Sequence, residues 1–336
     1  MDRELIVDVE QVTRRFGDIV ALRDLDLQIP KGAITVLLGP NGAGKTTAIR
    51  MITGALAPDQ GTSRVFGLDP SSNDGEQVRR RCGVVSAKPS LYDRLNGWDN
   101  LRYAAELYGL GRGSSADSTI REAAEMFAIE ESLAQQVAGY STGMKTRLAL
   151  ARSILHKPDL LLLDEPTSGL DPESALAVLE LIRNMASGGQ TVLMCTHLLL
   201  EAEGLADEIV VMQAGTNLMA GRPEDLSRNY WPTQQLRISS TIPEGLDSLA
   251  KHPAVLAYDR SGDTAVLEVA TLSDVPGIVA DLAAHNVPLQ SVVPFMPSLE
   301  ELYFAIRRDH GSIEGEMTPP GDPSGRRARP DTVSAA

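Results

Sequence analysis

The sequence predicts an α/β fold in which helices cover both faces of a parallel β-sheet, followed by a small α+β domain. Apolar segments at residues 160–163, 191–195 and 208–212 are separated from one another by helix-forming sequence. Strands buried on both faces of a parallel sheet have this near-continuous apolar composition, and helices form the crossovers between them. Hydrophobic residues make up 43% of the 336 positions, which is ample for a buried core.

The N-terminal part of the chain is predicted to contain short strands up to residue 38. The run at residues 33–38 is apolar and ends at a glycine-rich turn. A helix is expected from about residue 46 to 55, and a further strand at residues 62–66. A glycine-rich turn is thus expected between a predicted strand and a predicted helix.

A helical insertion is predicted at about residues 89–155, because apolar residues recur there every three to four positions, as in Trp98, Leu101 and Ala105. The first domain is expected to cover residues 1–225 and to include this insertion. Residues 215–232 are interpreted as a boundary region.

The C-terminal part is predicted to be an accessory α+β domain at residues 232–307. Its expected element order is βαββαβ, with strands at 236–239, 255–259, 265–269 and 288–293. A last helix should begin at Ser298, because Ser298 and Glu301 have the spacing of a capping box. Gly, Pro, Ser and Arg dominate residues 309–336, which we expect to be disordered.

Composition excludes several classes of protein. A net charge of −14 argues against nucleic acid as a partner, since phosphate binding needs a basic surface. No apolar run approaches the ~20 residues that span a bilayer, so a membrane role requires a partner. The N-terminus lacks the order of a secretory signal, which favours a cytoplasmic location. Cys82 and Cys195 lie in apolar segments and are expected to be buried and reduced.

A phosphate-binding loop is predicted between the strand at 33–38 and the following helix. Residues 39–46 fit the pattern GxxxxGK[ST] in the strand-to-helix context that this motif requires. Backbone N–H groups and the helix N-terminus would face the phosphates, while Lys45 reaches the β and γ phosphates of ATP and Thr46 holds Mg²⁺. The alternative is a simple glycine-rich turn. The candidate ATP-binding residues here are Gly39, Pro40, Asn41, Gly42, Ala43, Gly44, Lys45, Thr46 and Thr47.

Two carboxylates follow the apolar strand at 160–163, at the end of the sheet where ligands of parallel sheets bind. Asp164 is the candidate Mg²⁺ ligand. Glu165 is the candidate base that positions and deprotonates the water attacking the γ phosphate. Adjacent carboxylates at a strand end are often merely solvated, and the phosphate loop upstream is what favours the catalytic interpretation.

With the phosphate-binding loop and the two carboxylates identified, the chain resembles the ATP-binding subunits of ATP-binding-cassette (ABC) transporters across about residues 4–225. Residues 140–147, Tyr-Ser-Thr-Gly-Met-Lys-Thr-Arg, resemble the family signature LSGGQ. The resemblance implies a P-loop NTPase cassette with an antiparallel β subdomain and a helical insertion. Thr142 and Met144 depart from the signature in a manner similar to the drug- and ion-exporter branch, while Ser141 and Gly143 are retained.

The signature implies a dimer. In the family it faces ATP held by a second copy, so a homodimer, or another paired cassette, would form two composite sites. Ser141 and Gly143 sit where a helix should start, with hydroxyl, N–H groups and helix dipole able to face an anion. The alternative is that Ser141 only caps its helix.

Three further positions match the family pattern. Residues 168–171, ending at Asp171, resemble the loop through which the subunits sense each other. His197 resembles the switch histidine that contacts the γ phosphate, with a helix-capping histidine as the alternative. Phe16 corresponds to the aromatic residue that stacks on adenine, and a core phenylalanine is the competing interpretation.

One departure bears on catalysis. Ala87 aligns with a glutamine that in the family touches Mg²⁺ and the attacking water. Either Ser86, Lys88 or an ordered water replaces it, or hydrolysis is slower and less coupled to transport. We expect the milder effect, because Glu165 and His197 remain and provide most of the base and electrostatic catalysis.

The predicted function is therefore an ATPase that powers an exporter from the cytoplasmic face of the cell membrane. The resemblance implies a separate transmembrane permease that docks around residues 91–101, and an accessory domain that contacts the dimer or permease or serves as a structural lid. Two alternatives stay open. One is a nucleotide-gated regulatory subunit with little turnover, which Ala87 makes plausible, and the other is a soluble ABC ATPase without a transport role.

Overall fold

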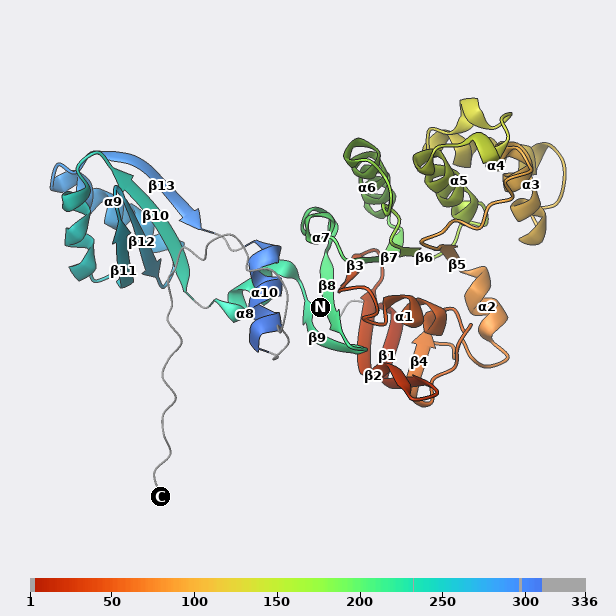
Figure 1. Ribbon diagram of the computed structural model, residues 1–336, viewed down its shortest axis with the longest axis horizontal. Helices are drawn as coiled ribbons and strands as arrows, with labels where there is room; N and C mark the ends of the chain where they lie inside the picture. Colours follow the sequence, from red (N-terminus) through yellow and green to blue (C-terminus); the bar gives the residue numbers. More distant parts are fainter. Residues whose placement is uncertain (1–3, 232, 296–297, 310–336) are drawn as a thin grey trace, which may run out of the picture.

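The computed structural model describes residues 4–231, 233–295 and 298–309, and it arranges them around three β-sheets (Figure 1). The central sheet has the order β5-β6-β7-β3-β8-β9, and its first five strands run parallel. The last strand pairs antiparallel with its neighbour. The predicted α/β fold with a parallel core is confirmed. The strands are β3 (Ile34–Leu38), β5 (Cys82–Val85), β6 (Leu160–Asp164), β7 (Thr191–Thr196), β8 (Glu208–Gln213) and β9 (Thr216–Gly221).

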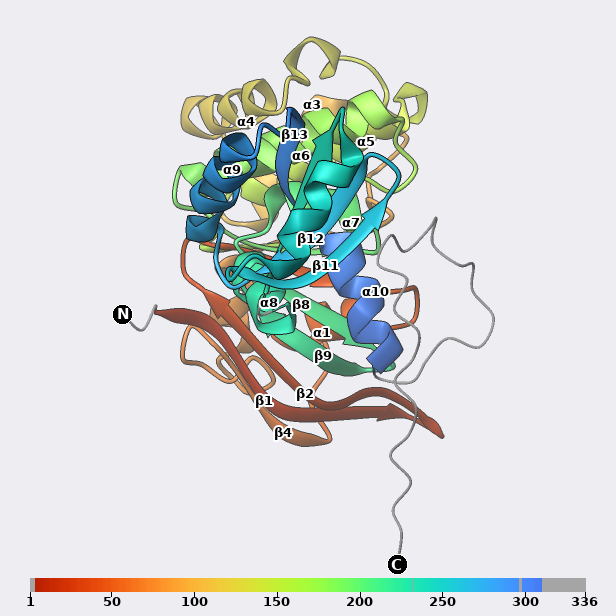
Figure 2. The ribbon, with the colours of Figure 1, turned by 90° about the vertical axis from the view of Figure 1, so that its left-hand side faces the viewer.

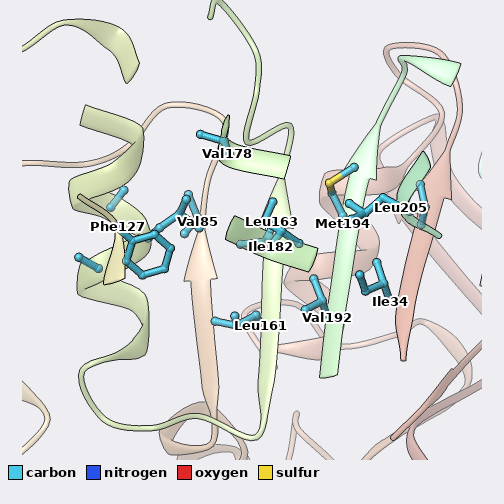
Figure 3. Close-up of a cluster of buried hydrophobic side chains, with 14 of the residues drawn as sticks. Ile34, Val85, Phe127, Leu161, Leu163, Val178, Ile182, Val192, Met194 and Leu205 are labelled. Atoms are coloured by element: carbon cyan, nitrogen blue, oxygen red, sulfur yellow. The ribbon is translucent and has the colours of Figure 1, made fainter. Parts of the chain in front are cut away.

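Strands β3, β6, β7 and β8 are buried on both faces, because alternate side chains along them enter two different cores. Leu161, Leu163 and Val192 point into the core that contains Phe127 of the helical region, as Figure 3 shows. Leu160 and Leu162 point to the opposite core, which includes the N-terminal strands. This double burial explains the near-continuous apolar sequence of these strands, such as residues 160–163 of β6.

The second sheet is antiparallel, with the order β2-β1-β4, and it packs through α1 against one face of the central sheet. A hairpin at Gly17, which has φ +59°, joins its two long strands. The elements are β1 (Leu5–Phe16), β2 (Ile19–Pro30), α1 (Lys45–Ile52) and β4 (Gln60–Val65). These residues form the antiparallel subdomain that the family resemblance implies.

Helices cover the other face. The insertion contains three α-helices and two short 3₁₀ turns, and its core includes the fully buried Leu101, Ile120, Phe127 and Leu148. These elements are α3 (Gly97–Leu107), α4 (Ser114–Met126), η1 (Glu130–Ser132), η2 (Val137–Gly139) and α5 (Thr142–Ile154). Three further helices connect strands of the sheet along the chain. They are α2 (Gly75–Arg80), α6 (Pro172–Ser187) and α7 (Leu199–Leu205).

The third sheet lies at the end of the molecule opposite the insertion (Figures 1 and 2). Its order, β11-β12-β10-β13, is fully antiparallel and has the split βαβ topology. Two helical segments cover one face, where Leu236, Ile238 and Leu267 are fully buried. The elements are β10 (Gln234–Ser240), η3 (Pro243–Lys251), β11 (Val255–Ser261), β12 (Thr264–Val269), η4 (Leu272–Asp274), α9 (Val275–Ala284) and β13 (Leu289–Phe295).

Two parts of the structure differ from the expectations. Residues 215–232, interpreted as a boundary, contain β9 and α8 (Pro223–Tyr230) as far as residue 231. The helix α10 (Leu299–Asp309), grouped by sequence with the accessory domain, packs instead against α7 and α8. Leu299, Leu302 and Ile306 join the core of the central sheet. The domain limits at 225, 232 and 307 stay predictions.

The capping box at the start of α10 is present. The Ser298 N–H donates to Glu301 Oε2 at 2.8 Å, and the Glu301 N–H donates to Ser298 Oγ at 3.2 Å. Within the described residues no helix is long and apolar enough to cross a bilayer. The predicted tail at 309–336 lies outside the described residues, apart from Asp309, which ends α10.

Candidate functional site

The loop between β3 and α1 has a shape that favours glycine at two positions. Gly42 and Gly44 have φ values of +82° and +104°, in the left-handed region. A Cβ atom on Gly44 would also lie 2.7 Å from the Ala21 carbonyl oxygen. The loop is anchored by its own backbone, since the Ala43 N–H donates to the Pro40 carbonyl at 3.1 Å. Asn41 lies exposed in this loop, and Thr47 is half-buried in α1.

Lys45 is buried at the base of this loop, with 5% of its side chain exposed. Its Nζ donates to the carbonyl oxygens of Gly39 at 2.7 Å and Pro40 at 3.2 Å. The ammonium also lies 3.5 Å from Glu165 Oε1. A buried cation needs such partners, and a phosphate would provide stronger, charged ones.

Thr46 and Asp164 form the candidate metal pair. Thr46 Oγ1 donates to Asp164 Oδ2 at 2.7 Å, and Asp164 is only 6% exposed at the end of β6. A hydroxyl and a carboxylate are the hard oxygen donors that Mg²⁺ prefers, and Mg²⁺ usually takes its remaining ligands from phosphates and water. In the described part of the chain no cluster of three or more acidic, His or Cys residues could hold a metal alone. The pair therefore fits a nucleotide-bound Mg²⁺.

Glu165 lies beside both Lys45 and His197. Its Oε1 atom is 3.2 Å from His197 Nδ1, and 18% of its side chain is exposed. Its backbone has φ +50°, which costs a non-glycine residue about 1–2 kcal/mol. The Glu165 N–H donates to the Cys195 carbonyl at 2.9 Å and fixes this turn to β7. Neither carboxylate at this strand end is a freely solvated group.

The two cysteines are structural. Burial raises the pKa of the Cys195 thiol well above its usual value, and the neighbouring Asp164 carboxylate raises it further. Burial also raises the pKa of Cys82 to about 12. Both are free and buried, as expected, and stay protonated.

Ser141, Gly143 and Asp171 form a second group at the adjoining N-termini of α5 and α6. Ser141 caps α5 by accepting the Met144 N–H at 3.2 Å, and Asp171 caps α6 by accepting the Ser174 N–H at 3.0 Å. A Cβ atom on Gly143 would lie 3.5 Å from Ser174 Oγ. Hydrogen bonds to Ser174 lower the pKa of Asp171.

No hydrogen bond joins this second group to the phosphate loop in the described structure. Among the described residues, none of the second group donates to or accepts from residues 39–46. Ser141 thus acts as a helix cap within its own chain, and the chain by itself supplies no signature contact to Lys45.

The structure bears on the remaining alternatives, which concern Phe16, His197 and Ala87. Phe16 is 43% exposed at the end of β1, so it is not a core residue, and the Arg14 guanidinium lies 5.1 Å from its ring centroid. The N-cap of α7 is Leu198, so His197 does not cap that helix. Ala87 is exposed, and the neighbouring Ser86 hydroxyl donates to the Lys88 carbonyl at 2.8 Å.

Sequence reasoning missed one residue of this region. Glu201 is 7% exposed and accepts hydrogen bonds from Thr196 and Thr167, which flank the site. Its only sequence signal is a carboxylate within the apolar stretch that begins α7.

The chain is similar to known ABC transporter proteins. A family model described as "ABC transporter" matches residues 22–168. The ABC transporter ATP-binding protein NatA of Bacillus subtilis is 36% identical over 226 residues, covering 66% of this chain and 91% of that protein. The daunorubicin resistance ATP-binding protein DrrA3 of Streptomyces coeruleorubidus is 33% identical over 316 residues, covering 92% and 98%. The solved structure of cbiO1 from Clostridium perfringens, part of the ABC transporter complex cbiONQ, aligns with a TM-score of 0.61 at 26% identity, covering 67% and 91%.

Proposed function

The chain belongs to the ABC transporter family as an ATP-binding subunit, and we propose that it hydrolyses ATP as a dimer to power export through a separate permease. Export is favoured by its similarity, over 92% of its length, to a protein named for daunorubicin resistance. The cargo is chosen by the permease, because the chain contributes the motor and not the pathway.

One observation carries the proposed hydrolysis: Lys45, Glu165 and His197 meet at the ends of three neighbouring strands, next to the Thr46–Asp164 pair. The glycine-rich loop and Lys45 bind the β and γ phosphates, while Thr46 and Asp164 hold Mg²⁺. The bound Mg²⁺ supplies positive charge against the charge that develops on the phosphate oxygens.

Glu165 acts on the attacking water. Its carboxylate orients this water and accepts its proton as the bond to the γ phosphorus forms. His197 holds the γ phosphate and, through its contact of 3.2 Å, fixes the direction of the Glu165 carboxylate. Phe16, which is exposed at the end of β1, stacks on adenine.

Dimerisation completes each site. The helix N-termini at Ser141 and Asp171 carry N–H groups and a positive helix dipole, yet they make no hydrogen bond to the phosphate loop of their own chain in the described structure. A second copy, placed head to tail, brings them to the nucleotide. ATP then lies between the two chains.

The permease docks on the helical insertion. Tyr92, Tyr103 and Leu107 are 50%, 44% and 70% exposed, and the two tyrosine rings lie edge to face at 5.1 Å. Exposed apolar groups are frequent at interaction surfaces. Tyr92 lies within the docking region predicted at residues 91–101, and Tyr103, which contacts it, lies just beyond that region on α3. Through that contact the subunit sits peripherally on the cytoplasmic face of the membrane.

Ala87 leaves hydrolysis in place at a reduced rate. Since the Ser86 hydroxyl already donates to the Lys88 carbonyl, an ordered water is the better replacement for the missing glutamine side chain. A regulatory subunit with little turnover is the second candidate, and Ala87 is the observation that favours it.

The test is the ATPase rate of the complex purified with its permease. We expect the wild-type rate to exceed that of Glu165→Gln by about 100-fold or more, since a positioned base contributes that much. Ala87→Gln should raise the rate. ATP-induced thermal stabilisation of Glu165→Gln serves as the control for intact binding. A wild-type rate no higher than that of Glu165→Gln contradicts the motor and supports the regulatory subunit.

A further inference from the structure

Glu201 is a buried carboxylate that joins the two loops carrying Glu165 and His197. It lies in the first turn of α7 with 7% exposure. Its Oε2 accepts a hydrogen bond from Thr196 Oγ1 at 2.6 Å, and its Oε1 accepts one from Thr167 Oγ1. A buried carboxylate is tolerated only when its oxygens have such donors, so both bonds are needed.

The bond to Thr196 fixes His197 from both sides. Thr196 is the last residue of β7, directly before His197. Its hydroxyl oxygen also accepts the N–H of Leu198, directly after His197, at 3.0 Å. The backbone on both sides of His197 is therefore held by the Thr196 hydroxyl, which is in turn held by Glu201.

The bond to Thr167 fixes the turn that follows Glu165. The Ser168 N–H donates to the Glu165 carbonyl at 3.1 Å, and the Leu170 N–H donates to the Thr167 carbonyl at 3.1 Å. This turn leads directly to Asp171. Glu201 is thus the one side chain in the described structure whose two oxygens tie the His197 turn to the turn between Glu165 and Asp171.

The helix carrying Glu201 is itself held from outside. Glu203, two residues further on, accepts the Leu299 N–H of α10 at 3.1 Å. Leu302 and Ile306 of α10 are buried in the same core as Ala202 and Leu205 of α7. The position of Glu201 is consequently fixed by packing and does not depend on its own two bonds alone.

We propose that Glu201 is a positioning residue for ATP hydrolysis, which sets the contact between His197 and Glu165 and places the Asp171 turn relative to it. The inference rests on the proposed ATPase function. Glu201 does not touch the phosphate loop, so it should affect the reaction rate and leave nucleotide binding unchanged. Catalytic groups displaced by about 1 Å lose about 100-fold in rate.

The first test is steady-state ATPase kinetics of the full complex. Glu201→Ala removes both acceptors and should lower kcat by about 100-fold while KM for ATP changes by less than about twofold. Glu201→Gln keeps an acceptor and a side chain of the same shape, and should restore most of kcat. Glu203→Ala is the matched control, because it changes an acidic residue of the same helix whose side chain, within the described residues, accepts a hydrogen bond from α10 and none from the site.

A second readout needs no turnover. The chain has five histidines, so the ¹⁵N imidazole signal of His197 can be assigned in full-length protein by comparison with His197→Ala. Glu201→Ala should shift this signal, and Glu203→Ala should not. A Glu201→Ala protein with wild-type kcat, or with an unshifted His197 signal, overturns the proposal. A wild-type protein without turnover refutes the ATPase function, and the His197 signal then still decides the role of Glu201.

Discussion

The glycines of the phosphate loop allow strain and steric clash to be measured separately. Gly44 has φ +104°, and a Cβ atom there would lie 2.7 Å from the Ala21 carbonyl and 2.9 Å from Leu22 Cδ2. Gly42 has φ +82°, with no atom within 4 Å of the corresponding Cβ position. Gly44→Ala therefore meets both costs, and Gly42→Ala meets only the backbone strain.

The expected loss of stability follows from these two costs. A left-handed alanine costs about 1–2 kcal/mol. Overpacking against backbone and a buried leucine costs a further ~1–3 kcal/mol. Gly44→Ala should therefore reduce the free energy of unfolding by about 2–5 kcal/mol, and Gly42→Ala by about 1–2 kcal/mol.

Urea unfolding followed by circular dichroism measures both values, and repeating it with Mg-ATP measures binding. ATP at 100 times its Kd stabilises the wild type by about 2.7 kcal/mol. Gly42→Ala should lose most of this gain, because the loop no longer aims its N–H groups at the phosphates. Equal destabilisation by the two substitutions, or an unaffected Gly44→Ala protein, would refute this reasoning.

Three further changes probe other parts of the molecule. Phe16→Ala should weaken ATP binding by about tenfold, because stacking on adenine is lost. Tripolyphosphate, which has no adenine, should bind unchanged in competition assays. Equal loss of affinity for both would exclude adenine stacking. Leu302→Ala, at a fully buried site of α10, should cost about 2–5 kcal/mol in urea unfolding, and a cost near zero would show that α10 is not docked. Burial lowers the pKa of His156 from its ordinary 6.5, so the unfolded chain binds its proton first and stability should fall as pH drops below 6.5. His156→Gln should weaken the dependence of the urea unfolding midpoint on pH across that range. An unchanged dependence would contradict this.

The parallel sheet and the phosphate loop could be predicted because their signals are local. β6 is apolar at residues 160–163 because both of its faces are buried, and the GxxxxGK[ST] pattern fixes a turn within eight residues. The capping box at Ser298 was visible for the same reason.

Other features depend on distant parts of the chain. β9 has no alternating pattern, and it forms because Ala214 and Gly215, both with positive φ, turn the chain back onto β8. The apolar face of α10 was predicted, but the sequence does not say which surface that face covers. Glu201 was missed because Thr167 and Thr196 approach it only in the folded chain. The individual roles of Lys45, Glu165 and the other site residues stay predictions.

A dimer built from two different variants tests the central claim most directly. Lys45→Ala and Ser141→Arg chains, each with its own affinity tag, are purified as a mixed pair and assayed for ATP hydrolysis. If Ser141 completes the site of the other chain, one site carries both changes and the other is intact, so activity rises above that of either variant alone, to as much as half of wild type. If Ser141 serves the ATP bound by its own chain, both sites are damaged, and the mixed pair stays as inactive as its parents.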